Sequence, residues 1–414
     1  MARLAPIRLA GMMAATALCA AAATEVAAQD GSVVLNNQLQ LGDVISGVTL
    51  NVEDAEGEVA VNNAAQGVSL SGSVQNGSLD LTSSQTMRGN TRATTTVTLT
   101  GDTEGPVNAE TQARGTYLAA GAYDADLTIE SNQVVGPSEV SAAATITGPA
   151  PRLLGGASVS TTAIANTAAL GASSGMVQGV IVQGSEAGVR SDTLAQTQYI
   201  PDTAEFISQS IGNSVLVNSD GVSGQDLTLR QRQAGDIVTA AVSANAGNAW
   251  DLAGRARATA NQALLYNQGG SVVVATDQSN LSQVRSSSTV TSYDFGAATS
   301  NAAGTANQVS IGNNGSYVEI DNAQVNSGGV EVTAGFEGTN GYDTYVAAEA
   351  MGNAVTGYAC SQCDGEMYVN NAQTNSGNVS ATASTTVRGG GRSVTTGANA
   401  IGNSATFYVS RPGI

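Results

Sequence analysis

The sequence of 414 residues contains no histidine and no lysine, because all 15 basic side chains are arginine. The absence of imidazole excludes a histidine general base, a Ser-His-Asp or Cys-His nucleophile and an imidazole metal ligand. The absence of lysine excludes a Schiff-base lysine and a P-loop lysine. These two absences remove a large share of the known enzyme mechanisms.

Aromatic residues make up only 4% of the chain and charged residues 12%, whereas 49 residues are glycine. A buried Phe or Trp supplies about 150–250 Å² of apolar contact area, so a long chain with few of them predicts a thin core repeated along an axis. The net charge of -18 argues against nucleic acid or an anionic membrane as a partner, since both require clustered basic residues.

The N-terminus has the pattern of a secretory signal peptide over residues 1–28. Two arginines precede a small and apolar run at residues 9–23, and small residues lead up to a predicted cleavage site after Ala28. Residues 29–414 are then the exported, repetitive β-rich region. No later stretch is long and apolar enough to span a bilayer, so no transmembrane segment is expected after signal removal.

The exported region has two cysteines, Cys360 and Cys363, in a C-x-x-C pair. Such a pair is typical of redox catalysis, half of a zinc site or a local disulfide. A zinc site would need two further thiolates or imidazoles, which the exported region lacks, and no helical pattern flanks the pair. We therefore expect a structural disulfide that closes a short loop, with a stabilising effect at the low end for disulfides.

Internal repeats are the most informative feature. Residues 320–330 return as residues 369–379, at an offset of 49, and the similarity is clearest over residues 300–409. Periods of this size are typical of stacked units with a shared core, in which amides repeated in register form ladders along the stack. The candidate ladder residues are Asn322, Gln324, Asn326, Asn371, Gln373 and Asn375.

A second repeated element is a small or apolar residue followed by Gly-Asn. It occurs at residues 211–213, 246–248, 311–313, 351–353 and 401–403. Between these elements apolar residues alternate over four to eight positions and turns follow, which predicts short strands. The best candidates for helix are the alanine-rich stretches 162–172 and 253–265, but they lack a wide apolar stripe and also fit strands facing a small-residue core.

Together these patterns predict an all-β, elongated β-solenoid that resembles a β-helix. Each coil of such a fold needs only a few inward Val, Ile, Leu or Ala side chains. The alternatives are a pair of β-sandwich domains and amyloid-like repeats without a fixed monomer.

No constellation of catalytic, cofactor-binding or metal-binding residues emerges from the sequence. The acidic run at residues 53–58 is expected to be an exposed turn, and residues 388–392 an exposed glycine-rich turn with two arginines. Residues 221–228 only partly match the calcium-binding nonapeptide of β-rolls and have no tandem neighbour, so no calcium site is expected there.

With its Asn-Ala-Gln-x-Asn-Ser-Gly repeats, Gly-Asn turns and single C-x-x-C pair, the whole chain resembles the holdfast anchor family HfaD of stalked α-proteobacteria. The resemblance implies a protein at one pole of the cell surface, associated with the outer membrane, that ties the holdfast polysaccharide to the envelope. It also implies the companion anchor proteins HfaA and HfaB as partners. It describes no enzymatic residues and no cofactor.

The working hypothesis is therefore a non-enzymatic adhesion protein shaped as a rod or fibre subunit. Its strand ends would join like or related chains, and its outward polar side chains would bind sugars weakly but many times. A curlin-like functional amyloid subunit and a β-helical polysaccharide lyase or hydrolase are the competing hypotheses, and the second has less support in the residues.

Overall fold

The computed structural model describes residues 31–315, 317–360 and 365–409, and these ranges contain strands but no helix. The predicted signal peptide with Ala28, and Cys363, lie outside the described residues. No described segment forms a helix long and apolar enough to cross a membrane. The strands are β1 (Ser32–Gln40), β2 (Val44–Val52), β3 (Val59–Met87), β4 (Thr91–Leu99), β5 (Asp102–Thr103), β6 (Val107–Val135), β7 (Glu139–Thr147), β8 (Arg152–Leu153), β9 (Ala157–Ser173), β10 (Met176–Ser185), β11 (Gly188–Gln233), β12 (Ile237–Asn280), β13 (Gln283–Asn313), β14 (Tyr317–Asn326), β15 (Val330–Ala359), β16 (Glu366–Asn375), β17 (Val379–Val387) and β18 (Ser393–Val409).

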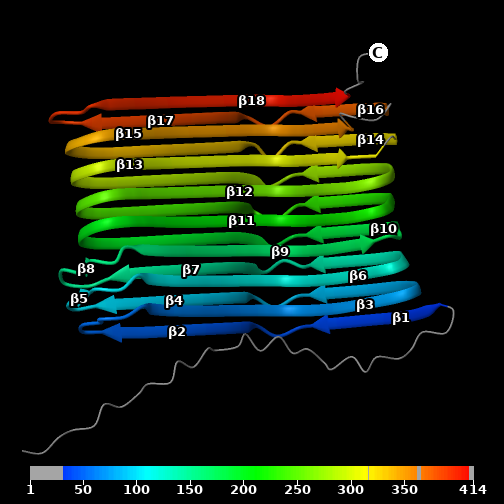
Figure 1. Cartoon of the computed structure of the whole chain (residues 1–414), viewed down its shortest axis with the longest axis horizontal. Coiled ribbons are helices and arrows are strands. Elements are labelled where there is room, and N and C mark those ends of the chain that lie inside the picture. Colours follow the sequence, from blue (N-terminus) through cyan, green and yellow to red (C-terminus); the bar gives the residue numbers. More distant parts are fainter. Residues whose placement is uncertain (1–30, 316, 361–364, 410–414) are drawn as a thin grey trace, which may run out of the picture.

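Each turn of the chain forms one coil with three segments. In the first coil, segment 1 is β1, segment 2 is β2 and segment 3 is residues 59–75 at the start of β3. Segments 1 and 2 run one after the other along one side of the coil, and segment 3 returns along the other side (Figure 1). Long strands such as β11 contain several segments in succession.

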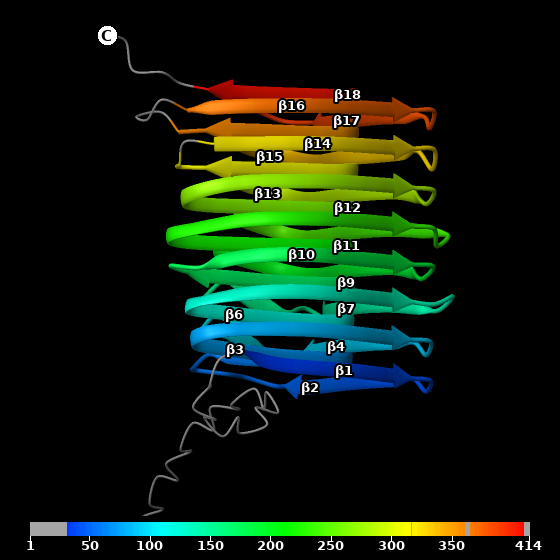
Figure 2. The same ribbon diagram turned by 90° about the vertical axis from the view of Figure 1, so that its right-hand side faces the viewer.

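The coils stack in parallel register, from the blue end at β1 to the red end at β18 (Figure 1, Figure 2). Every ladder between the described strands is parallel, and one column of register partners contains a glutamine from segment 1 of each coil. Its eight members mark eight coils: Gln38, Gln85, Gln133, Gln183, Gln231, Gln278, Gln324 and Gln373. The predicted all-β solenoid is confirmed, and the antiparallel sandwich alternative does not describe this chain.

The interior consists of two apolar clusters side by side. One lies between segment 2 and the first half of segment 3, and includes Val97, Val159 and Val238. The other lies between segment 1 and the second half of segment 3, and includes Leu127 and Leu227. Small β-branched and alanine side chains suffice because each coil contributes only a few inward positions.

The alanine-rich stretches 162–172 and 253–265 lie within β9 and β12, so they are strands and not helices. Their alternating burial places alanine inward, where it faces the narrow core. Tertiary packing between coils thus overrides the high intrinsic helix propensity of alanine.

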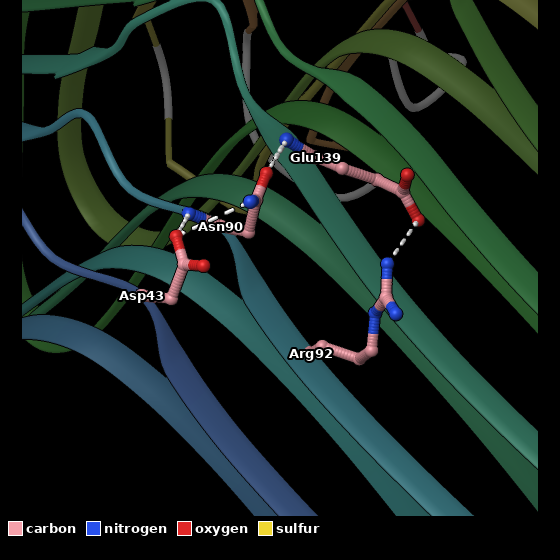
Figure 3. Close-up of polar contacts among 4 residues, drawn as sticks. All are labelled: Asp43, Asn90, Arg92 and Glu139. Carbon is pink, nitrogen blue, oxygen red and sulfur yellow. Dashed lines mark hydrogen bonds and ion pairs between the residues drawn. The ribbon is translucent and has the colours of Figure 1, made fainter.

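Polar side chains bridge three successive coils at the corner between segments 1 and 2 (Figure 3). The carboxylate Oδ1 of Asp43 accepts a hydrogen bond of 2.7 Å from the backbone N–H of Asn90, whose own side-chain Oδ1 accepts one of 2.9 Å from the N–H of Glu139. The Glu139 carboxylate lies 3.7 Å from the Arg92 guanidinium. Each backbone N–H therefore binds a side-chain oxygen of the coil before it.

Candidate functional site

The six candidate ladder residues lie in β14 and β16, where three amide pairs face each other across two coils. In each pair the side-chain nitrogen of one residue donates to the side-chain oxygen of the other at 2.7 Å. The pairs are Asn322 with Asn371, Gln324 with Gln373, and Asn326 with Asn375. In β14 the three amides are buried, with at most 1% of each residue exposed, so these inward faces offer nothing to a ligand.

The glutamine ladder extends through all eight coils. Each Nε2 donates to the Oε1 of the glutamine one coil earlier, at 2.7–3.2 Å. The same nitrogen also donates across the coil to a backbone carbonyl of segment 3, as Gln231 does to Gln262 at 2.9 Å. The column therefore joins neighbouring coils and also joins the two sides of each coil.

A second amide column runs along the middle of segment 3, between the two apolar clusters. It contains Asn166, Asn213, Asn261, Asn307, Asn353 and Asn403. Each asparagine donates to the next coil at 2.7–2.8 Å, opposite to the direction of the glutamine column. Buried amides are tolerated here because their donors and acceptors are satisfied within the columns.

Cys360 directly follows β15 and is 4% exposed, while Cys363 lies outside the described residues. The Cys360–Cys363 disulfide therefore stays a prediction. Among the described residues, no three Asp, Glu, Cys or His side chains are grouped in a way that would hold a metal ion.

An open groove of about 880 Å³ lies at the corner between segments 2 and 3 in coils four to eight. Each of these coils contributes one large aromatic or arginine side chain to its lining, together with smaller residues: Tyr199, Trp250, Phe295, Tyr342 and Arg392. Trp250 is the only tryptophan of the sequence and is 61% exposed, and Tyr342 is 53% exposed. Exposed aromatic rings in a concave site are typical of ligand-binding surfaces.

The rings of the groove are held in defined positions. Trp250 and Tyr342 meet edge to face, with centroids 6.4 Å apart, and the Arg392 guanidinium lies 5.6 Å from the Tyr342 centroid. The Asn340 amide donates to Oδ1 of Asp294 at 3.0 Å, which places a polar pair beside the aromatic surface. The groove thus combines apolar ring faces with hydrogen-bonding groups.

Two glycines leave room for these rings. A Cβ at Gly296 would lie 2.4 Å from the carbonyl oxygen of Trp250 and 3.0 Å from its ring, and one at Gly341 would lie 2.3 Å from the Phe295 ring. Any larger residue at either position would force the neighbouring backbone or ring to move.

The electrostatics of the groove are set by an exposed ion pair. A hydrogen bond from Arg392 lowers the pKa of the Asp343 carboxyl below its ordinary value. The paired guanidinium is oriented by both Asp343 and the Tyr342 ring. The groove therefore presents a guanidinium–carboxylate pair next to two exposed rings.

A second aromatic hollow, of about 620 Å³, lies on the outer face of segment 3. In one register column Tyr266 is followed by Gly312, Tyr358 and Tyr408. The last two rings stack with centroids 5.9 Å apart and an interplanar angle of 3°, and the missing side chain at Gly312 leaves the hollow between Tyr266 and Tyr358.

The sequence interpretation missed both aromatic surfaces because the aromatics are few and widely spaced. Only Tyr117 and Tyr123 precede Tyr199, so the C-terminal coils hold nearly all of them. The acidic run 53–58 and the glycine-rich turn 388–392 lie exposed at the segment 2–3 corners of the first and last coils. Residues 221–228 lie within β11, where Gly221 and Val222 are exposed at a corner but Ser223, Gly224, Gln225 and Leu227 are buried.

The model of the family HfaD, holdfast attachment protein D, matches residues 53–329 of the chain. The chain belongs to this family. Membership implies a cell-surface protein of the holdfast attachment machinery with an adhesive role. Comparison with curated proteins and with solved structures gave no match. Tyr342 and Arg392 of the groove lie beyond the matched range.

Proposed function

We propose that this holdfast attachment protein is a non-enzymatic surface adhesin that anchors the holdfast polysaccharide to the outer cell envelope. Family membership supports a role in attachment. The absence of histidine and lysine supports a role without catalysis, because the commonest general bases and amine nucleophiles are missing from the sequence.

The observation that carries the proposal is the aromatic groove. The C–H face of a pyranose ring packs on an aromatic ring, while its hydroxyl groups need donors and acceptors at the edges. Trp250 and Tyr342 provide the ring faces, and Asp294 and Asn340 provide the polar edge. The groove spans several coils, so it fits a chain of sugars better than a single one.

The amide columns suit the protein to carry load. Pulling along the axis would have to break the backbone ladders and the side-chain hydrogen bonds between two coils together, because all of them join the coils along the stacking axis. A buried hydrogen bond contributes about 0.5–1.5 kcal/mol net, so many parallel bonds at each coil boundary give a strong joint.

The proposal places the mature protein at the cell pole, after cleavage of the predicted signal peptide at Ala28. The companion proteins HfaA and HfaB would connect it to the outer membrane. The resemblance of the sequence to the anchor family supports these partners and this location.

A complemented deletion strain tests the proposal. Cells carrying Trp250→Ala with Tyr342→Ala are compared with wild type and with Tyr123→Ala, a matched control that is 53% exposed, like Tyr342, but lies outside the groove. Equal surface amounts of each variant are established by immunoblotting. We expect the groove variant to shed holdfast polysaccharide into the medium and the control to retain it.

If cells with the groove variant retained the polysaccharide, the groove would not be the site at which this protein binds it. Release of small saccharide products when the purified wild-type protein is incubated with holdfast polysaccharide would contradict the non-enzymatic role and favour a lyase or hydrolase.

A further inference from the structure

Both ends of the solenoid expose strands that are paired on one edge only. Within the described residues, β1 and β2 in the first coil pair only with the second coil, and β16, β17 and β18 in the last coil pair only with the seventh. An unpaired strand edge is a template for another chain. The structure therefore has two open ends, and they have the same three-segment outline.

We propose that copies of this protein stack head to tail, with the first coil of one copy adding in parallel to the last coil of another. The joint repeats the contact that each coil makes with its neighbour inside the chain. Four features of the two ends match one another.

The first matching feature is the glutamine column. Inside the chain, Gln85 donates from Nε2 to Oε1 of Gln38, and Gln373 donates to Gln324 in the same direction. Gln38 begins the column and Gln373 ends it, so Nε2 of Gln38 in the added copy meets Oε1 of Gln373. The column then continues across the joint without a change of direction.

The second matching feature is the corner between segments 1 and 2. Asp43 is the first-coil equivalent of Asn90, which binds the N–H of the next coil through its side chain (Figure 3). Asn378 precedes β17 at the equivalent place in the last coil. Its side-chain oxygen would therefore accept the N–H of Asp43 in the added copy.

The third matching feature is the apolar interior. Buried core residues fill the middle coils, whereas the inward side chains of β2 in the first coil and of β17 in the last coil are only partly buried. These side chains include Val44, Val48 and Leu50 at one end and Val379 and Ala383 at the other. Stacking places Val44 over Val379 and Val48 over Ala383, and removes both rows from water.

The fourth matching feature is charge. The segment 2–3 corner carries Glu53, Asp54, Glu56 and Glu58 in the first coil, and Arg388 and Arg392 in the last coil. Ion pairs already join neighbouring coils at this corner, since Arg152 contacts Asp102 at 2.8 Å and Arg388 contacts Glu337 at 2.6 Å. Stacking places the acidic corner of one copy directly on the basic corner of the other, which favours parallel addition over any other docking.

The joint is heterologous, because two different surfaces meet. Since the coils stack along a common axis, repetition of the joint gives an open filament and not a closed ring. A filament presents the aromatic groove once per copy, so it would raise the avidity of the anchor for a long polysaccharide.

The test uses the exported protein, purified without polysaccharide, so its outcome is separate from the function of the groove. One variant carries Arg388→Glu with Arg392→Glu, and the other carries Glu53→Arg, Glu56→Arg and Glu58→Arg, which leaves Asp54 as the only acidic residue of that corner. The first then has acidic residues at both ends, the second has basic residues at both ends, and an equimolar mixture restores opposite charges at every joint. Far-ultraviolet circular dichroism establishes that both variants keep the β fold.

Assembly is followed by sedimentation over a range of concentrations and by electron microscopy. We expect wild type to form filaments one solenoid wide, each variant alone to need at least a tenfold higher concentration, and the mixture to assemble like wild type. A wild type that stays monomeric at all concentrations would overturn the proposal. Variants that assemble alone as readily as wild type, or a mixture that fails to recover, would also overturn it.

Discussion

The side-chain nitrogen of Gln231 donates hydrogen bonds to Oε1 of Gln183 at 2.8 Å and to the backbone carbonyl of Gln262 at 2.9 Å. The first bond joins two coils, and the second crosses the interior of one coil. Gln278 in turn donates to Gln231 at 2.7 Å. One buried amide therefore fixes both the spacing of the coils and the width of each coil.

Replacing Gln231 with alanine should destabilise the protein strongly. The substitution removes the Gln231 donor from Oε1 of Gln183 and from the Gln262 carbonyl, and one of the two acceptors from Nε2 of Gln278. Each buried group left unsatisfied costs about 1–3 kcal/mol. We expect the free energy of unfolding, measured by urea titration with circular dichroism, to fall by at least about 2 kcal/mol. The matched control Gln178→Ala removes an exposed amide of segment 1 and should change stability by less than about 0.5 kcal/mol. Equal effects for the two variants would contradict a stabilising role for the ladder.

Replacing Asn261 with aspartate should make stability depend on pH. Asn261 donates to the Ser279 carbonyl at 3.0 Å and to Oδ1 of Asn307 at 2.8 Å, so a carboxylate would face two oxygens in a buried site. Burial and repulsion raise the pKa of this new carboxyl above its unfolded value of about 3.9. The pH-dependent part of the penalty relative to wild type is therefore absent below that value, grows as the pH rises to the higher pKa of the folded state, and is constant above it. Urea titrations at several pH values measure it.

The matched variant Asn261→Leu has no titratable group. Its stability difference from wild type should stay constant over the same pH range. If the Asp variant showed the same flat difference, the amide column would not be a closed, water-free environment.

The ion pairs between coils should matter much less for the fold. Arg255 lies 2.8 Å from Glu205 in the preceding coil, but both side chains are more than a third exposed. Exposed pairs of this kind contribute about 0–1 kcal/mol. Arg255→Gln should therefore lower the free energy of unfolding by less than about 1 kcal/mol, well below the effect of Gln231→Ala, in the same urea assay. A larger loss would show that charge, and not the amide ladder, determines the stacking of the coils.

The fold class was predictable because segment 1 of the last two coils has nearly the same amino-acid sequence. Asn322 and Asn371 lie 49 residues apart and share their neighbours, so the register between these coils is visible in the sequence. Elsewhere corner lengths differ, and hydrogen-bonded partners in successive coils lie from 46 to 51 residues apart. An alignment at one fixed offset therefore loses the repeat in the earlier coils.

The Gly-Asn element likewise identifies only part of the repeat in the sequence. Asn213, Asn353 and Asn403 belong to one column. Its other members, Asn166, Asn261 and Asn307, follow alanine, so they do not match the Gly-Asn motif. At Gly352 the preceding position has no room for a side chain, since a Cβ there would lie 2.3 Å from the carbonyl oxygen of Gly402, whereas alanine occupies this position before Asn261 and Asn307. Gly247-Asn248 and Gly312-Asn313 have the same letters but lie at other places in the coil.

The aromatic groove had no signal in the sequence. Its residues come from corners of five coils, differ in residue type from coil to coil and are separated by unequal distances along the chain. Only the stacking of the coils brings Trp250 near Tyr342, which lies two coils away. Sites of this kind depend on the register of the coils and not on a local motif.

The single tryptophan makes binding in the groove directly observable. Trp250 is 61% exposed, so its emission should be that of a solvated indole, and a sugar chain packed on the ring would exclude water from it. We expect holdfast polysaccharide to shift the emission to shorter wavelength and to reduce quenching by acrylamide. An unrelated polysaccharide should leave both properties unchanged. Tyr342→Ala should weaken the response at least about tenfold in polysaccharide concentration, because the loss of one buried aromatic contact costs about 1–3 kcal/mol. An emission spectrum that does not change at saturating polysaccharide would place the binding surface elsewhere on the solenoid.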